Sequence, residues 1–189
     1  NKVIDGIIIG EGEESFKELL DYYIGGKINL KDINGIAFKE TAWLKKKEQK
    51  IINNDYFTQD GIIVTPFRTE MNLSTLPFPY ENMEDFENKI IYYETSRGCP
   101  YSCRYCLSSI DKKLRLKDME QIQKELDIFL SHKVPQVKFV DRTFNCNREH
   151  TKAIWQYIKE HDNGITNFHF EISADILNEE EIALLNSMR

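Results

Sequence analysis

The spacing of apolar residues predicts a strand followed by a helix at the start of the chain. Residues 2–9 are rich in Val and Ile and alternate little, which is typical of a strand buried in a parallel sheet. After a glycine-rich turn at residues 10–15, apolar residues recur at helical spacing over residues 16–24, and Gly25-Gly26 ends that pattern. We therefore expect residues 1–26 to be the last strand and helix of a doubly wound unit whose earlier strands precede this chain.

Residues 27–88 follow a less regular pattern. Short strand signals lie at residues 35–39 and 61–64, and they are separated by a polar stretch that includes Lys45–Lys47. We interpret the lysine run as the solvated face of a hairpin. Residues 76–80 read Leu-Pro-Phe-Pro-Tyr, and each proline disfavours helix in the residue before it. This region is predicted to be a small β connector that ends in a proline-rich linker.

A regular alternation of strand and helix signals begins at residue 90. The predicted strands are residues 90–95, 136–140 and 167–172. The predicted helices are residues 116–129, 148–161 and 178–188. Asn178 is expected to cap the last of these helices, because Glu181 follows three residues later. Strands that alternate with helices form right-handed β-α-β units around a parallel sheet, so the predicted fold class is α/β, with about three βα units in residues 89–189.

Composition places the chain among ordinary globular proteins. Of its 189 residues, 41% are hydrophobic and 30% are charged, and the formal net charge is −6. An acidic chain disfavours a general nucleic-acid surface, which needs a basic face. No apolar stretch approaches the length of a membrane span, and we expect a cytoplasmic protein. The chain opens at Asn1 directly into an apolar run and stops at Arg189 directly after an amphipathic stretch, so we expect a piece of a longer protein.

Three of the four cysteines, Cys99, Cys103 and Cys106, lie within eight residues. An even number of cysteines could form two disulfides in a secreted protein. However, cysteines clustered in this way are poorly placed to cross-link a chain of this length. Soft thiolates grouped in one loop suit an iron–sulfur cluster or zinc. Structural zinc usually takes four ligands, and the sequence has no second cysteine pair. Three thiolates can instead hold three corners of a cubane cluster and leave the fourth iron without a protein ligand.

Around these cysteines the chain resembles the radical S-adenosylmethionine (SAM) family. The segment from Arg97 to Cys106 reads Arg-Gly-Cys-Pro-Tyr-Ser-Cys-Arg-Tyr-Cys, with three and then two residues between cysteines and an aromatic residue before the last one. The resemblance implies a [4Fe–4S] cluster whose open iron binds SAM, and cleavage of SAM to methionine and a 5′-deoxyadenosyl radical. It also implies a partial parallel (β/α) barrel. Tyr105 would lie against the adenine, and the alternative for it is ordinary core packing.

Further site residues follow from this resemblance and from the strand ends, where the chemistry of a parallel barrel lies. Asp141 follows the second strand, where family members contact the SAM amino group, although the usual Gly-Gly-Glu is replaced here by Val-Asp-Arg-Thr-Phe. Glu171 and Ser173 lie at or near the end of the third strand and are predicted to contact SAM or substrate. The alternatives are a helix-initiating acid for Asp141 and a salt-bridged core acid for Glu171. Cys146 is interpreted as a free, partly buried thiol instead of a fourth ligand.

The start of the chain resembles the last strand, loop and helix of the cobalamin-binding domain that precedes many radical SAM domains. Its Gly10-Glu11-Gly12 turn, the proline-rich linker and the cysteine loop follow one another in the order typical of that family. The resemblance implies that residues 1–26 end a Rossmann-like cobalamin domain, residues 27–88 connect it, and residues 89–189 form the first half of the radical SAM domain. The turn would lie near the tail of cobalamin. The histidine loop that approaches cobalt is not in this chain, so the piece alone is not expected to bind cobalamin.

Together these features predict a radical SAM enzyme of the cobalamin-dependent class that carries out methyl transfer or a rearrangement. The piece alone is expected to be inactive, because it lacks the strands that complete the SAM pocket. The alternatives are a non-catalytic iron–sulfur or zinc-binding module and a metal-free structural fragment. The expected partners are a small-molecule or peptide substrate and a reductant such as ferredoxin or flavodoxin, and neither a membrane nor nucleic acid is expected. An open three-unit sheet is also expected to favour dimerisation through its exposed edge.

Overall fold

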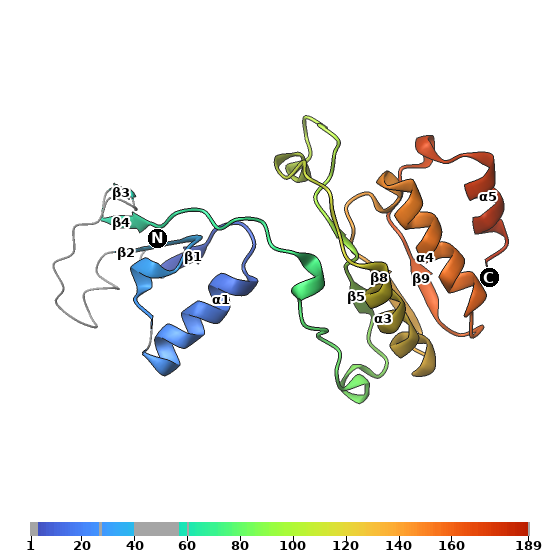
Figure 1. Ribbon diagram of the computed structural model, residues 1–189, viewed down its shortest axis with the longest axis horizontal. Coiled ribbons are helices and arrows are strands. Elements are labelled where there is room, and N and C mark those ends of the chain that lie inside the picture. The colour runs from blue at the N-terminus through green and yellow to red at the C-terminus, as the bar shows by residue number, and fades with distance from the viewer. Residues whose placement is uncertain (1–3, 27, 40–56, 60, 189) are drawn as a thin grey trace. The chain divides into compact units, whose positions relative to one another are not determined.

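The chain contains two compact units. The computed structural model describes residues 4–26, 28–39, 57–59 and 61–188. These fall into the units Asn1–Met71 and Asn72–Arg189 (Figure 1). Each unit has its own cluster of buried apolar side chains, which is the core that a separate domain requires.

In its described residues, the first unit is an antiparallel sheet with one α-helix. Its strands are β1 (Gly6–Ile8), β2 (Ile36–Lys39), β3 (Phe57–Gln59) and β4 (Ile62–Val64), in the order β1-β2-β4-β3. Helix α1 (Glu13–Leu20) continues into a π-helical turn at Asp21–Gly25. The core of this unit consists of Tyr22, Leu30, Ile33, Ile36, Phe38 and Ile63. Strands β2 and β4 confirm the two short strands expected in the connector.

The structure groups the first unit differently from the sequence prediction. Strand β1 is not a buried parallel strand, because it lies at the edge of the sheet and pairs antiparallel with β2. Strand β1 therefore shares one sheet with the connector strands, and the boundary between units falls after Met71. A run of apolar residues indicates a strand but does not identify its partner. Residues 2 and 3 of the predicted strand and the Lys45–Lys47 hairpin lie outside the described residues.

The second unit contains a parallel sheet with helices between its strands. The strands β5 (Ile91–Tyr93), β8 (Gln136–Phe139) and β9 (Asn167–His169) pair in parallel in that order. The helices are α3 (Met119–Ser131), α4 (Arg148–Glu160) and α5 (Glu179–Asn186). A short antiparallel ladder of β6 (Ser96–Arg97) and β7 (Arg115–Leu116) lies within the first crossover. The α/β class and the predicted order of elements are confirmed, although the third strand ends earlier than expected.

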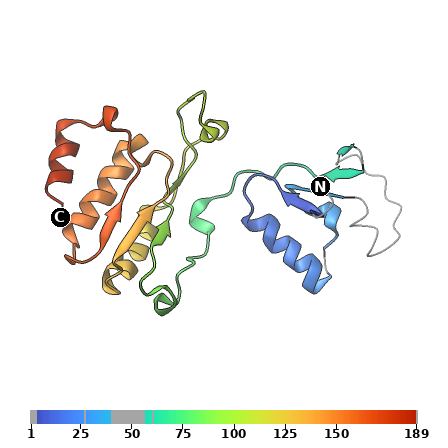
Figure 2. The same ribbon diagram turned by 180° about the vertical axis from the view of Figure 1, so that it is seen from behind.

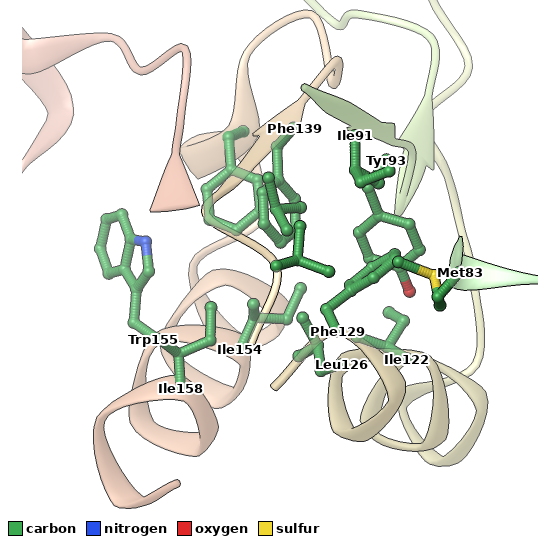
Figure 3. Close-up of a cluster of buried hydrophobic side chains, with 13 residues drawn as sticks. Met83, Ile91, Tyr93, Ile122, Leu126, Phe129, Phe139, Ile154, Trp155 and Ile158 are labelled. Carbon is green, nitrogen blue, oxygen red and sulfur yellow. The ribbon is translucent and has the colours of Figure 1, made fainter. Parts of the chain in front are cut away.

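Helices α3 and α4 cover one face of the parallel sheet with apolar side chains. Every second residue of β5 and β8 points to these helices, and the buried ones are Ile91, Tyr93, Val137 and Phe139. The helices contribute Ile122, Leu126, Phe129, Ile154, Trp155 and Ile158. Figure 3 shows side chains of both helices meeting those of the strands in one cluster. Burying one side chain of this size stabilises the fold by about 1.5–3 kcal/mol, so this contact fixes the position of the sheet.

The opposite face of this sheet is polar and more exposed. Tyr92 and Lys138 are register partners on that face, and Tyr92 is 55% exposed. Figure 1 shows α3 and α4 on one side of the strands, and Figure 2 shows the sheet from behind. In the described part of the chain, α3 and α4 therefore cover one face of the sheet. The opposite face, with Tyr92 and Lys138, is its uncovered face.

The end of α3 contains a residue in the left-handed region of backbone conformation. Lys133 has a φ of 53°. The backbone N–H of Val134 donates to the Phe129 carbonyl at 3.0 Å, and that of Lys133 donates to the Leu130 carbonyl at 3.2 Å, which is a Schellman ending. Glycine is the usual residue at this position, because a Cβ costs roughly 1–2 kcal/mol there.

We expect Lys133→Gly to raise the free energy of unfolding by about 0.5–1 kcal/mol. The substitution removes the strain that the Cβ causes in the folded state. Part of this stabilisation is lost because glycine has greater conformational freedom in the unfolded chain. Chemical denaturation measures the difference. Lys124→Gly, inside the same helix, is the matched control and should lower stability by about 1 kcal/mol. Equal losses in the two variants would contradict the proposed strain.

Candidate metal centre

The three clustered cysteines lie in a loop that is closed at its base. The loop leaves β6 and returns at β7, where Ser96 pairs with Leu116 and Arg97 pairs with Arg115. Just inside this ladder, the backbone N–H of Cys99 donates to the Asp111 carbonyl at 2.8 Å. Figure 1 shows the loop leaving the same edge of the parallel sheet as the segments that follow β8 and β9. The backbone thus presents the cysteines at the carboxyl ends of the strands, as the sequence predicted.

Gly98 permits the two sides of the loop to meet. Its φ is 94°, a conformation that residues with a Cβ rarely adopt. A Cβ at this position would lie 2.2 Å from the carbonyl oxygen of Lys113. Glycine is therefore required by both conformation and space immediately before Cys99.

A buried charged network holds the exit of the loop. The Lys117 ammonium lies 2.9 Å from Glu125 Oε2, with 9% and 5% of the two side chains exposed. The Tyr93 hydroxyl donates to the same carboxylate oxygen at 2.6 Å. Burial and then the hydrogen bond to Glu125 raise the pKa of Tyr93, so its phenol remains a donor. Because buried charges are stable only when they are partnered, this network ties the loop exit to β5 and α3.

The three cysteine thiols differ in exposure. Cys99 is buried, Cys106 is half-buried and Cys103 is exposed. All four cysteines of the chain lie in its described part, and none forms a disulfide. Among the described residues, no three His, Cys, Asp or Glu side chains are gathered so that they could hold a single metal ion. A cubane makes a different demand, because each thiolate binds a different iron, and three thiols from one loop are a donor set that fits it.

Asp141 is turned into the protein. Its carboxylate is 1% exposed and accepts hydrogen bonds from the Thr95 backbone N–H at 3.2 Å, from the Thr95 hydroxyl at 2.8 Å and from the Ser96 hydroxyl. Burial raises the pKa of Asp141, while the hydrogen bonds from Ser96 and Thr95 oppose that rise. The geometry gives this carboxylate the role of joining the end of β8 to β5 and β6. Direct contact between Asp141 and SAM stays a prediction.

Glu171 and Ser173 lie beyond the end of β9. The Glu171 carboxylate is 3.2 Å from the Lys138 ammonium, and its side chain is 55% exposed, so it is paired but is not a core acid. The backbone N–H of Ser173 donates to Asn145 Oδ1 at 2.8 Å, and its hydroxyl donates to Asp175 at 2.7 Å. Contact of either residue with SAM or substrate stays a prediction.

The tip of the cysteine loop exposes apolar side chains. Tyr105 is 94% exposed, so the alternative of core packing does not apply to it. Leu107 and Ile110 are exposed beside it in sequence. The loop therefore offers an aromatic ring next to Cys106, as contact with adenine would require, and that contact stays a prediction.

Cys146 lies in the segment that follows β8 and is partly buried. Burial and then the neighbouring Cys99 raise the pKa of the Cys146 thiol. A raised pKa disfavours the thiolate, which is the form that binds metals. A bound metal deprotonates the thiol that binds it, so the interpretation of Cys146 as a free thiol stays a prediction, and its substitution tests that role directly.

The residues predicted for cobalamin belong to the first unit. Gly10, Glu11 and Gly12 lie between β1 and α1, and Gly12 is the N-cap of the helix. The Glu11 carboxylate accepts a hydrogen bond from the Met71 backbone N–H at 3.0 Å. The Arg68 guanidinium lies 2.9 Å from Glu14 Oε2. The turn is therefore fastened to the segment that leaves this unit, and contact with cobalamin stays a prediction.

Two residues near the site were not identified from the sequence. Lys138 lies between Val137 and Phe139 in β8, and this alternation could have placed it on the uncovered face. Thr143 Oγ1 lies 3.7 Å from Cys99 Sγ. No local pattern reports that contact, because the two residues are 44 positions apart.

Comparison with known proteins gives a family and several relatives. Residues 93–189 match the family model of the radical SAM superfamily. An uncharacterized methyltransferase of Pyrococcus horikoshii is 30% identical over 161 residues, which cover 83% of this chain and 32% of that protein. The cobalamin-dependent radical SAM methyltransferase TokK of Streptomyces tokunonensis is 25% identical over 152 residues, which cover 75% of this chain and 20% of that protein. This chain thus spans a third or less of these relatives.

A solved structure has a similar fold. The radical SAM methyltransferase TsrM from Kitasatospora setae, with cobalamin and a [4Fe–4S] cluster bound, gives a TM-score of 0.66 at 17% identity. The match covers 98% of this chain and 37% of that one.

Among the described residues, none of the helices has the length and apolar character needed to cross a membrane.

We expect Gly98→Ala to lower the free energy of unfolding by roughly 2 kcal/mol or more, because the new methyl group would collide with the Lys113 carbonyl. Gly164→Ala is the matched control. Gly164 has a φ of 67°, and a Cβ there would meet nothing within 4 Å. Its substitution should cost only about 1–2 kcal/mol of conformational strain. Denaturant unfolding of both variants checks the difference, and equal losses would contradict the steric role of Gly98.

The stability difference between the wild type and Asp141→Asn is expected to depend on pH. Burial raises the pKa of Asp141 in the folded state, so its contribution to stability is complete below the unfolded pKa and is lost as the pH rises through the folded pKa. Asparagine has the same shape and does not titrate in this range. Urea unfolding from about pH 4 upward should therefore show the free energy of unfolding of the wild type falling relative to that of the variant. An advantage that grows with pH would show that hydrogen bonding outweighs burial.

Proposed function

The chain belongs to the radical SAM superfamily, and we propose that it forms part of a cobalamin-dependent methyltransferase in which Cys99, Cys103 and Cys106 bind a [4Fe–4S] cluster. The names of the relatives support methyl transfer, since both are methyltransferases and one is cobalamin-dependent. The fold shared with TsrM agrees with this class. The methyl acceptor, and the activity of the whole protein, are part of the proposal.

One observation carries this proposal: a single loop, closed at its base, presents three cysteines at the carboxyl ends of a parallel sheet. Bound there, the cluster and SAM would supply the one-electron cleavage of SAM to methionine and a 5′-deoxyadenosyl radical. The contribution of the chain is to hold three irons with thiolates and to leave one iron for SAM. Tyr105, exposed next to Cys106, would contact the adenine.

The carboxyl edge of the sheet would supply the remaining contacts. Glu171, on the uncovered face with Lys138, is a candidate for the amino group of SAM or for substrate. Ser173, whose backbone N–H donates to Asn145, would contact SAM or substrate beside Glu171. Contact of Asp141 with SAM is part of the proposal, and its hydrogen bonds with Thr95 and Ser96 would also fix the strand end from which the cysteine loop leaves.

The proposal also includes the architecture and partners of the full protein. The three parallel βα units would be the first part of a (β/α) barrel, whose inner face is the uncovered face of the sheet. The Gly10-Glu11-Gly12 turn would approach the tail of cobalamin when the rest of that domain is present. An external reductant such as ferredoxin or flavodoxin would deliver the electron, and the substrate would be a small molecule or peptide. The open edge of β9 would favour dimerisation of this piece.

Anaerobic reconstitution of the full 189-residue chain tests the cluster site. We expect about four irons and four sulfides per chain, with a paramagnetic resonance signal after reduction that changes when SAM is added. Cys99→Ala, Cys103→Ala and Cys106→Ala should each lose the cluster, because each removes the only thiolate on one iron. Cys146→Ala is the matched control and should keep it.

The same experiment separates a SAM-binding cluster site from a non-catalytic iron–sulfur or zinc site. Zinc without iron, or loss of iron in Cys146→Ala together with no response to SAM, would overturn the proposal. Those results would favour a non-catalytic iron–sulfur or zinc module. In the reconstituted protein, production of 5′-deoxyadenosine from SAM would support the cleavage chemistry.

A further inference from the structure

A hydroxyl group lies beside the buried cysteine of the loop. Cys99 Sγ lies 3.7 Å from Thr143 Oγ1, a distance within reach of a hydrogen bond to the large sulfur atom. Cys99 is 7% exposed, so water has little access to its sulfur. Thr143 belongs to the segment after β8 and reaches the loop across the end of the sheet. The contact therefore joins the cysteine loop to the segment after β8 at the carboxyl edge of the sheet.

The direction of this hydrogen bond depends on the protonation of the sulfur. In a thiol, either atom can donate. A cysteine that binds iron is a thiolate, which has no proton and can only accept. With Cys99 on the cluster, the Thr143 hydroxyl is then the donor.

The segment on both sides of Thr143 is fixed by hydrogen bonds. Thr143 is the N-cap residue of a 3-10 turn, Phe144–Cys146, but its side chain makes no capping hydrogen bond there. Two positions earlier, Asp141 is locked by Thr95 and Ser96. On the other side, the backbone N–H of Phe144 donates to the Glu171 carbonyl at 2.9 Å, and the Phe144 ring is 2% exposed. The hydroxyl is thus aimed at the sulfur by a segment fixed at both ends.

We infer that Thr143 is a positioning residue that donates a hydrogen bond to the Cys99 thiolate and raises the reduction potential of the cluster. The inference rests on the proposed function. Hydrogen bonds to cluster sulfurs stabilise the more negatively charged, reduced state, and at a buried sulfur water does not compete with the donor. The chain would in this way ease delivery of the electron that SAM cleavage consumes.

The test is a redox titration of the reconstituted full chain, followed by paramagnetic resonance. Thr143→Val removes the hydroxyl and keeps the branched shape, and we expect its midpoint potential to shift to a more negative value. Thr143→Ser restores the donor and should return the potential towards that of the wild type. Thr166→Val makes the same change at a threonine that precedes β9 at the amino end of the sheet, and it should leave the potential unchanged.

A second measurement reports the hydrogen bond itself. In deuterated water, electron–nuclear double resonance of the reduced cluster should show an exchangeable deuteron coupling that is weakened in Thr143→Val and kept in Thr143→Ser. If Thr143→Val fails to take up iron, Thr143→Ala carries the same comparison with less bulk against the loop. The iron and sulfide content of each variant is measured first, so that potentials are compared only between fully loaded clusters.

The outcomes separate this inference from the proposed function. A wild-type chain that takes up no iron–sulfur cluster would overturn the cluster site and the role of Thr143 together. A wild-type cluster that responds to SAM, with the same potential and deuteron coupling in Thr143→Val, would overturn only the role of Thr143. A purely structural role for the hydroxyl would lower cluster content without moving the potential of the clusters that remain.

Discussion

A buried carboxylate joins the strand ends from which the whole candidate site is built. Asp141 follows β8, and its oxygens accept hydrogen bonds from Thr95 and Ser96, which lie at the end of β5 and in β6. A carboxylate that is 1% exposed is tolerated only when donors replace its lost water. The three residues are therefore interdependent. Where they meet, the cysteine loop begins, and the segment with Thr143 turns back towards that loop.

The far end of the cysteine loop is fixed by a second buried charge. Glu125 of α3 accepts hydrogen bonds from Lys117 and Tyr93, so the loop exit, a helix and a strand converge on one carboxylate. Between these two anchors the loop tip is exposed, with Tyr105 almost entirely in solvent. The fold thus combines rigid ends with an open middle. Such a loop can present thiolates in a defined direction without enclosing the group that they would bind.

Much of this fold could be predicted from local pattern. The apolar spacing in α3 and α4 and the capping box of Asn178 with Glu181 are properties of a few neighbouring residues, and they fix the type of each element. The cysteine motif is local in the same sense, because Gly98 and the three thiols lie in one short segment. The first strand could not be placed so well. Its apolar run is compatible with parallel or antiparallel pairing, and only β2 decided between them.

The sequence by itself determined the α/β class, the order of helices and strands in the second unit, and the donor set of three clustered thiols. The tertiary structure decided which of the predicted residues are buried and what each of them contacts. Asp141 faces the interior because Thr95 and Ser96 offer donors there, and Thr143 meets Cys99 because parallel strands end at a common edge. Hydrophobic periodicity arises from neighbouring residues in the chain. Hydrogen bonds between strand ends join residues more than forty positions apart, and no local pattern encodes them.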